Sequence, residues 1–175
     1  MKLVLGFAVP LLFGYVFQQM YNFVDTAIVG RTLGSAALAA VGSTGSLNFL
    51  ILGFCNGICA GFGIPIAQSF GAKDEVEVRR YVTNSVWLAG VISVVMAVIT
   101  AIGTRTMLVW MSTPADILDD AVNYIQLIFA TIPVTMLYNL SGGVLRALGD
   151  SKTPVYYLVL ASVINIVLDI VCIVY

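Results

Sequence analysis

Several stretches of about 20 residues in this chain are almost free of charged side chains, and this feature most limits what it can fold into. Sixty per cent of its 175 residues are apolar and ten per cent are charged, whereas a soluble domain carries about 25% charged residues. An α-helix rises about 1.5 Å per residue, so such a stretch crosses the roughly 30 Å hydrocarbon core of a bilayer. The sequence therefore predicts an all-α protein, a polytopic bundle of membrane-spanning helices.

The apolar runs predict five helices in a single domain, residues 1–175. Their expected bounds are about residues 3–28, 37–70, 82–102, 121–145 and 155–175. Threonine–proline pairs predict the starts of the last two, with Thr113 and Thr153 as caps, because a threonine oxygen can accept an orphan amide hydrogen. The chain stops inside an apolar run, so we expect it to be an incomplete part of a larger protein.

Lysines and arginines divide unevenly between the two sides of the expected bundle. One side receives six, namely Lys2, Lys73, Arg79, Arg80, Arg146 and Lys152, and the other receives Arg31 and Arg105. Cytoplasmic loops carry an excess of these residues. We therefore expect a multi-pass protein of the cell (inner) membrane with its N-terminus in the cytoplasm.

Two carboxylates, Asp25 and Asp169, stand inside the first and fifth expected helices. Gln18 and Asn22 precede Asp25 at helical spacing, and Asn165 stands one turn before Asp169. The spans contain no lysine or arginine to neutralise either acid, so each must take up a proton, share one or bind a cation. This pattern predicts an ion-coupled site, whereas Gln18 and hydroxyls such as Ser162 are better explained as groups that hydrogen-bond between helices.

Glycines and prolines predict packing and bending. Gly53, Gly57 and Gly61 recur every fourth residue on one face of the second helix, which is typical of close helix packing. Pro10 lacks an amide hydrogen and is expected to bend the first helix, and Pro65 and Pro133 are expected to act in the same way in the second and fourth.

The remaining polar residues favour no catalytic function. Cys55 and Cys59 lie one turn apart in an apolar run and are interpreted as packing residues, since the chain has no histidine to complete a metal site. No nucleophile–base pair or set of metal ligands can be assembled, so an enzyme is disfavoured and no cofactor is expected. No basic arm suggests nucleic acid. The acidic residues around Asp119 suit the solvated start of the fourth helix.

Three segments carry a resemblance to a known family. The stretches "VPLLFGYVFQQMYNFVDTAIVGRTLGSAALAAVG", "QSFGAKDEVEVRR" and "GGVLRALGDSKTPVYYLVLASVINIVLDIV" resemble the first helices, the loop between the second and third helices, and the end of the fourth helix through the fifth helix of the multidrug and toxic compound extrusion (MATE) family. Members of that family have twelve helices in two lobes of six. The resemblance implies that this chain is helices 1 to 5 of the N-terminal lobe, without the second lobe.

The resemblance also implies a function and its residues. The expected function is a cation-coupled antiporter, driven by Na⁺ or H⁺, that exports drugs and other amphipathic, often cationic, small molecules. The matching positions for the cation site, including a possible Na⁺ at the two acids and Asn165, are Asp25, Tyr124, Asn139, Asn165 and Asp169. Pro10 matches the proline whose bending is linked to protonation in some members. Family members often have proline after the helix 5 acid, where this chain has Ile170.

Two alternatives stay open. One is a flippase of lipid-linked saccharides from the same superfamily, although such proteins often line the cavity with basic residues that these spans lack. The other is a non-transporting membrane module that assembles through its glycine-rich second helix.

Overall fold

The computed structural model describes the backbone of residues 2–32 and 34–174. Within this range the side chains at positions 2–7, 10, 21, 25, 29, 31, 32, 34–37, 169, 170 and 172–174 lie outside the description. The elements are α1 (Lys2–Thr32), α2 (Gly34–Gly71), α3 (Glu75–Trp110), α4 (Leu118–Ala130), α5 (Ile132–Ala147) and α6 (Lys152–Val174). The described residues contain no strand, which confirms the predicted all-α class.

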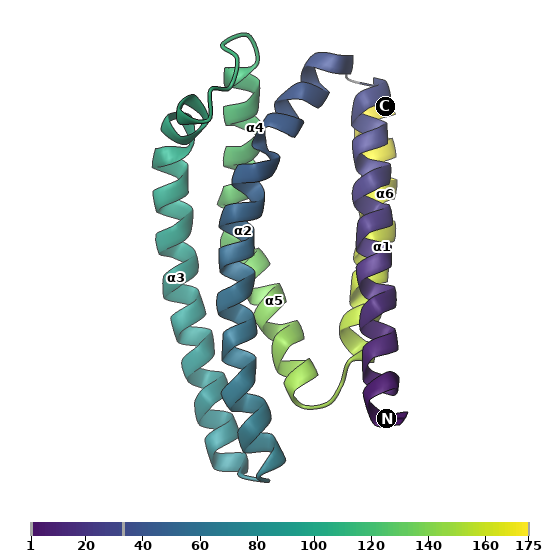
Figure 1. Cartoon of the computed structure of the whole chain (residues 1–175), viewed down its shortest axis with the longest axis vertical. Helices are drawn as coiled ribbons and strands as arrows, with labels where there is room; N and C mark the ends of the chain where they lie inside the picture. Colours follow the sequence, from purple (N-terminus) through teal and green to yellow (C-terminus); the bar gives the residue numbers. More distant parts are fainter. Residues whose placement is uncertain (1, 33, 175) are drawn as a thin grey trace. The chain divides into compact units, whose positions relative to one another are not determined.

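Two compact units make up the chain. One consists of Met1–Leu38 with Gly149–Tyr175, so that α1 and α6 form a pair, and we call it the α1–α6 unit. The other is Ala39–Leu148, which holds most of α2 together with α3, α4 and α5, and we call it the α2–α5 unit. In Figure 1, α1 and α6 lie side by side and run in the same direction.

The core of the α2–α5 unit is built from the faces of α4 and α5 that turn toward α3. Ile125, Phe129, Ile132, Met136 and Leu140 are almost completely buried there. Their spacing of three and four residues gives each short helix a single apolar stripe. Two polar contacts also join α4 to α3. The Gln126 side chain donates to the Ala101 carbonyl at 3.1 Å, and Arg105 pairs with Asp119 at 3.0 Å.

The predicted fourth helix is two helices. α4 and α5 meet at Thr131 with a bend of 46°, so the expected single helix over 121–145 is wrong in its continuity. Pro133 gives the physical reason, because it cannot donate an amide hydrogen to the carbonyl of Phe129 and it disfavours helical geometry in the residue before it. The bending expected of Pro133 is therefore present, and the Thr131 hydroxyl donates to the Ile128 carbonyl at 2.7 Å beside the break.

By length and composition, two described helices are able to cross a membrane, Leu38–Gly71 and Glu75–Trp110. The bent pair of α4 and α5 adds a third if it counts as one span. Lys152–Leu168 of α6 is apolar but shorter. α1, with 31 residues, contains several positions outside the description, so the predicted five spans are tested only in part.

The glycines predicted to pack together have no neighbour in the described part of the chain. Gly53, Gly57 and Gly61 are exposed, and a Cβ atom added at any of them would meet nothing within 4 Å. The close approach between α2 and α5 is made on the other side of α2. There a Cβ on Gly143 would lie 3.6 Å from the Cys59 carbonyl, and one on Gly63 would lie 3.8 Å from the Gly143 carbonyl.

The packing interpretation of the two cysteines agrees with their burial. Cys55 and Cys59 are free thiols with 1% and 2% of their surfaces exposed. The Cys59 thiol lies 3.6 Å from the Met136 carbonyl of α5, to which it donates. Small side chains at these positions allow α2 to lie close to α5.

The turn from α2 to α3 is set by a left-handed residue and a cap. Lys73 has φ 59°, and the amides of Lys73 and Asp74 donate to the carbonyls of Phe70 and Ser69, each at 3.0 Å. These paired bonds satisfy the last carbonyls of α2. The Asp74 carboxylate then accepts from the Glu77 amide at 3.0 Å and starts α3. Ser112, with φ 58°, makes the corresponding turn after α3.

Both predicted threonine caps are wrong. α4 begins at Leu118 without a side-chain cap bond, and the Thr113 amide closes the turn after α3 by donating to Leu108. At the start of α6 the acceptor is Asp150, whose Oδ1 lies 3.0 Å from the amide nitrogens of both Lys152 and Thr153. An aspartate two or three residues before these amides reaches them more directly than Thr153 itself, which lies inside the helix.

Replacing Asp74 by alanine should destabilise the start of α3. Loss of a capping carboxylate typically costs about 1 kcal/mol, so we expect the Asp74→Ala variant to unfold at a lower temperature in detergent micelles. Asp74→Asn keeps an oxygen acceptor and should stay close to wild type. Glu75→Ala, at the exposed neighbouring acid, is the matched control. Equal melting temperatures for Asp74→Ala and Glu75→Ala would contradict the capping role.

Acid should weaken the start of α6 through Asp150. The Thr153 hydroxyl and the amides of Thr153 and Lys152 hold the pKa of this carboxyl below its usual value of 3.8. A lowered pKa in the folded state means that the stabilisation is complete above the unfolded-state value and is lost as pH falls through the folded-state value. The wild type should therefore melt at a higher temperature than Asp150→Asn at neutral pH. This difference should disappear as the pH falls through the lowered folded-state pKa of Asp150. A difference independent of pH would contradict this assignment.

Candidate functional site

The candidate site begins with the side of α6 that packs on α1. A Cβ added at Gly14 of α1 would lie 3.4 Å from Val155 and 3.6 Å from Leu158. At 3.6 residues per turn, positions 155, 158, 162, 165 and 169 all fall on one side of α6. Asn165 therefore continues the side of α6 that contacts α1, and Ser162 between them is 7% exposed.

Because α1 and α6 run parallel, their contact at Gly14 determines which residues of α6 lie at the same height as position 25. Asp25 stands eleven residues after Gly14, which is about three full turns, so position 25 falls on the same side of α1 as Gly14. Equal steps along α6 from Val155 and Leu158 reach positions 166 and 169. The backbone register thus brings position 25 of α1 level with the Asn165–Asp169 segment of α6. The carboxylates of Asp25 and Asp169 themselves lie outside the described side chains.

Asn165 carries the distinctive polar atom of this unit. Its Oδ1 is buried, and no hydrogen-bond donor reaches it among the described residues. A buried amide oxygen without a partner costs roughly 1–3 kcal/mol, and lipid offers it nothing to bond. Amide and carboxylate oxygens are the ligands that hard cations such as Na⁺ and Ca²⁺ accept. The residues expected at the site therefore fit either a cation or a shared proton at this level.

Further polar groups line α1 on either side of position 25. Asn22 donates from its amide nitrogen to Gln19 Oε1 at 3.4 Å, and the Thr26 hydroxyl donates to the Asn22 carbonyl at 2.8 Å. Gln18 was predicted on this stripe, and Gln19 was not. The spacing of Gln19, Asn22 and Thr26, at i, i+3 and i+7, could have placed Gln19 on this stripe from the sequence.

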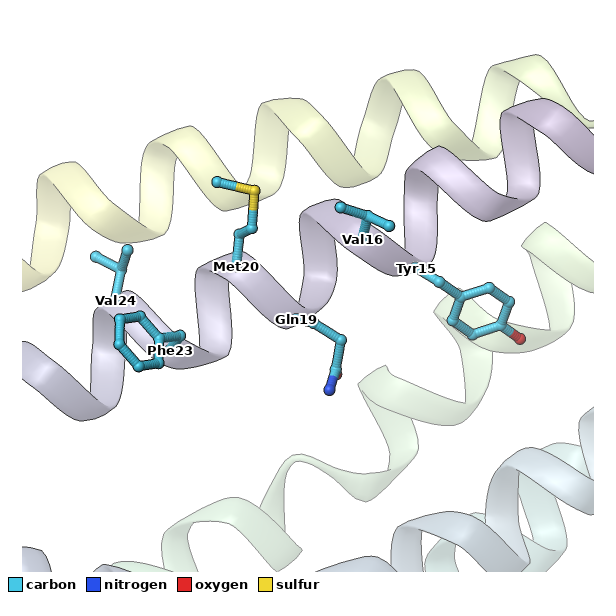
Figure 2. Close-up of a pocket in the computed structure, with 6 residues that line it drawn as sticks. All are labelled: Tyr15, Val16, Gln19, Met20, Phe23 and Val24. Atoms are coloured by element: carbon cyan, nitrogen blue, oxygen red, sulfur yellow. The ribbon is translucent and has the colours of Figure 1, made fainter.

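A groove of about 430 Å³ lies along the exposed side of α1 in the α1–α6 unit. Its lining residues are mostly apolar or aromatic, and Figure 2 shows them: Tyr15, Val16, Gln19, Met20, Phe23 and Val24. Tyr15 and Gln19 extend from the helix and bring a hydroxyl and an amide to this surface (Figure 2). Tyr15 and Phe23 are 69% and 76% exposed. A wide, apolar surface with few polar groups is typical of sites for organic molecules.

Tyr124 and Asn139, the two expected contributors from the fourth helix, belong to the α2–α5 unit. They stand on α4 and α5, on opposite sides of the bend at Thr131, so they do not share one continuous helical face. Tyr124 is 37% exposed. The half-buried Asn139 donates to the carbonyl of Thr135 on its own helix at 2.9 Å. Their assignment to the cation site stays a prediction.

Two further positions bear on the site, Pro10 of α1 and the buried amide of Asn48 in α2. Pro10 falls within α1, but its side chain lies outside the described residues, so its helix-bending role stays a prediction. Asn48 of α2 also has a buried Oδ1 without a donor in the described part of the chain. The sequence analysis did not single out Asn48, because one asparagine in an apolar run is commonly a hydrogen-bonding group between helices.

Comparison with known proteins gives a consistent answer over nearly the whole chain. The MatE family model matches residues 10–171. The "Probable multidrug resistance protein YoeA" of Bacillus subtilis is 40% identical over 162 residues, which are 93% of this chain and 35% of that protein. The chain therefore spans about a third of the length of the curated relatives that it matches.

Solved structures show the same fold. A MATE protein in the bent conformation is 26% identical and superposes with a TM-score of 0.89 over 97% of this chain and 38% of its own. A MOP superfamily transporter from Pyrococcus furiosus, described as having a binding pocket of reversed polarity, gives a TM-score of 0.91 at 26% identity, over 97% of this chain and 37% of its own.

Replacing Asn165 by leucine should not weaken the fold. The substitution removes a buried oxygen that has no donor among the described residues and adds apolar volume, so the melting temperature without added cation should stay equal or rise. The wild type should gain melting temperature with added Na⁺ or on acidification, and Asn165→Leu should lose that gain. Asn123→Leu, at an exposed position of α4, is the matched control. A large destabilisation specific to Asn165→Leu would show that its amide is already bonded.

Proposed function

The chain belongs to the MatE family, and from this membership we propose that it forms most of the N-terminal lobe of a cation-coupled antiporter that exports amphipathic, often cationic, organic molecules. Several of the relatives that it matches are named for multidrug resistance. They are also much longer than the chain, which agrees with a second lobe supplied by the rest of the protein.

The buried Oδ1 of Asn165 is the observation on which the proposal rests. In an apolar helix, a buried oxygen that no donor reaches among the described residues, level with position 25 and one turn before Asp169, is a strong indication of a ligand. Asp25 and Asp169 would supply the negative charge, and Asn165 would supply a neutral oxygen. A proton or a Na⁺ neutralises this charge in a medium where an isolated carboxylate is costly.

Coupling follows from differential binding. A cation that binds one packing of α1 against α6 more tightly than another shifts the population toward the first packing. Because α1 carries both the groove and Asp25, a change in how α1 packs would alter both sites together. Release of the cation on the other side of the membrane returns the helices to their first arrangement. This exchange is how a membrane ion gradient would drive export.

The groove along α1 supports the proposed substrate class. Its aromatic side chains offer flat apolar surfaces, and aromatic faces attract organic cations. The few polar groups, from Tyr15 and Gln19, would orient a bound molecule without requiring one particular shape. In the complete protein this surface would form one wall of a substrate cavity.

Bending of α1 at Pro10 is part of the proposal. Proline removes one backbone hydrogen bond and lowers the cost of a kink. A related MATE protein has been solved in a bent conformation. In this chain, a bend at Pro10 would move the segment that contains the groove and Asp25.

The proposed orientation places the N-terminus in the cytoplasm. In the α2–α5 unit, α2 and α5 run in the same direction, so Lys73, Arg79, Arg80 and Arg146 gather at one end and Arg105 lies at the other. The end with more positive charge is expected in the cytoplasm.

Of the two alternatives, the saccharide flippase has less support because several of the matched relatives are named for multidrug resistance and none of those compared is named for a saccharide. The non-transporting module depends on the glycine face of α2. That face packs on nothing in the described residues.

Replacing either acid by asparagine in the full-length protein should abolish coupled export. We expect Asp25→Asn and Asp169→Asn each to remove the dependence of ethidium efflux on the Na⁺ or proton gradient in proteoliposomes, because the amide neither binds a proton nor carries charge. Each gradient is imposed alone, so the experiment also identifies the coupling ion.

The control is Asp116→Asn, which removes an exposed acid of the loop before α4. It should transport like wild type. Efflux that kept its full dependence on the gradient in both acid variants would refute the coupling assignment, while leaving the family membership untouched.

A further inference from the structure

The guanidinium of Arg146 lies back along α5, over a pair of glycines about one turn before its own position. A Cβ added at Gly142 would lie 3.4 Å from Arg146 Nη1, and one added at Gly143 would lie 4.0 Å from Nη2. Arg146 stands in the last turn of α5, so its side chain points away from the end of the helix. Helical side chains tilt toward the N-terminus, and the missing side chain of Gly142 leaves space for this one.

The same pair of glycines stands at the contact between α5 and α2. A Cβ on Gly143 would lie 3.6 Å from the Cys59 carbonyl, and Arg146 is half-buried. The guanidinium is therefore held at the edge of the contact between α2 and α5. A charge that is removed in part from water is costly unless an opposite charge or hydrogen bonds compensate it.

No group in the described part of the chain neutralises this guanidinium. The two ion pairs there join Arg80 to Glu77 and Arg105 to Asp119. The Arg146 side chain makes no hydrogen bond to any described residue. Because arginines are rarely buried without a partner, this position indicates an anion that comes from outside the described residues.

Stabilisation of the helix end does not account for the position of this side chain. A cation near a helix C-terminus usually interacts with the last carbonyl groups. The Arg146 guanidinium lies about one turn before them, and the Val144 carbonyl accepts from the Leu148 amide at 3.0 Å instead. An anion bound beside this guanidinium would also stay clear of the partial negative charge at the end of α5.

Positive charge gathers at this end of the α2–α5 unit. The turn from α2 to α3 and the end of α5 lie at the same end (Figure 1). Two of the acids there are already engaged, because Asp74 caps α3 and Glu77 pairs with Arg80. Basic pockets between membrane helices bind anionic lipid headgroups. The charged residues of the unit at this end are four basic ones, Lys73, Arg79, Arg80 and Arg146, and three acids, Asp74, Glu75 and Glu77.

We propose that Arg146 binds the phosphate of an anionic membrane lipid at the edge of the contact between α2 and α5. A guanidinium donates two parallel hydrogen bonds to a phosphate, which an ammonium group cannot do. α2 continues from Gly63, beside Gly143, for eight residues to Gly71, which is about 12 Å. The guanidinium is thus deeper than the turn from α2 to α3, at a level that favours a lipid over a soluble anion. The proposal does not depend on the transport function or on the acids of the cation site.

A lipid-dependent melting temperature tests this site. The full-length protein is stripped of lipid in a neutral detergent at about 0.5 M potassium chloride, where exposed charges are strongly screened. Added phosphatidylglycerol should raise the melting temperature of the wild type, because a ligand of the folded state stabilises it. Arg146→Gln should lose this gain. Arg79→Gln removes the same charge from an exposed position at the same end of the unit and should keep the gain.

A second variant tests the position of the guanidinium and leaves every charge in place. Gly142→Leu puts a side chain into the space that the guanidinium occupies, and leucine is favourable in a helix, so the protein should fold. This variant should also lose the gain from phosphatidylglycerol. Phosphatidylcholine, which has no net charge, and inorganic phosphate, which has no acyl chains, should give the wild type little or no gain.

Each contrary result has a definite meaning. An equal gain in Arg146→Gln and the wild type would overturn the proposal, and a full gain in Gly142→Leu would overturn the placement of the site. A gain from inorganic phosphate alone would overturn the assignment to a lipid. If lipid had no effect on the wild type while Arg146→Gln melted at a lower temperature without lipid, the partner would be a carboxylate in the rest of the protein and the proposal would be wrong.

Discussion

The cost of an unpaired polar group in lipid governs this structure. The hydroxyls of Ser93, Thr100 and Thr104 in α3 donate to carbonyls of their own helix, and carbonyls at the ends of α2 and α3 are satisfied by turn amides. Against this background, two buried amide oxygens that no donor reaches in the described part of the chain stand out, those of Asn48 and Asn165. Asn165 is the one beside the positions of two acids, and this makes it the centre of the proposed site.

The two compact units divide the expected tasks. The α1–α6 unit holds both acids, Asn165 and the groove on α1. The α2–α5 unit has a well-packed core, an ion pair between Arg105 and Asp119, and a bend fixed by Pro133. A well-packed unit of several helices in the same chain as a simple helix pair suits a transporter, since a pair of parallel helices can change its packing while other helices keep theirs.

Much of the fold could be predicted from the sequence, because apolar runs bounded by charge define helices in lipid regardless of detail. The break at Thr131 and the cap at Asp150 were less accessible. A bend at Pro133 was expected, but not that it would end one helix and begin another. The cap depends on which of several nearby groups reaches an amide first, and a threonine–proline pair gives the same signal inside a helix as before one. The glycine pattern of α2 marked small residues but not the contact, which Gly63 and Gly143 make instead.

For the site, helical spacing placed Asn165 one turn from Asp169, but only the contact of Gly14 with α6 shows which part of α6 lies level with position 25.

The most direct test of the account is infrared difference spectroscopy of the full-length protein as pH is raised or Na⁺ is added. The account predicts a change in carboxyl bands that is missing from Asp25→Asn and Asp169→Asn. Bands that stay unchanged in the wild type, or that change equally in these variants, would contradict a cation or proton site at these acids.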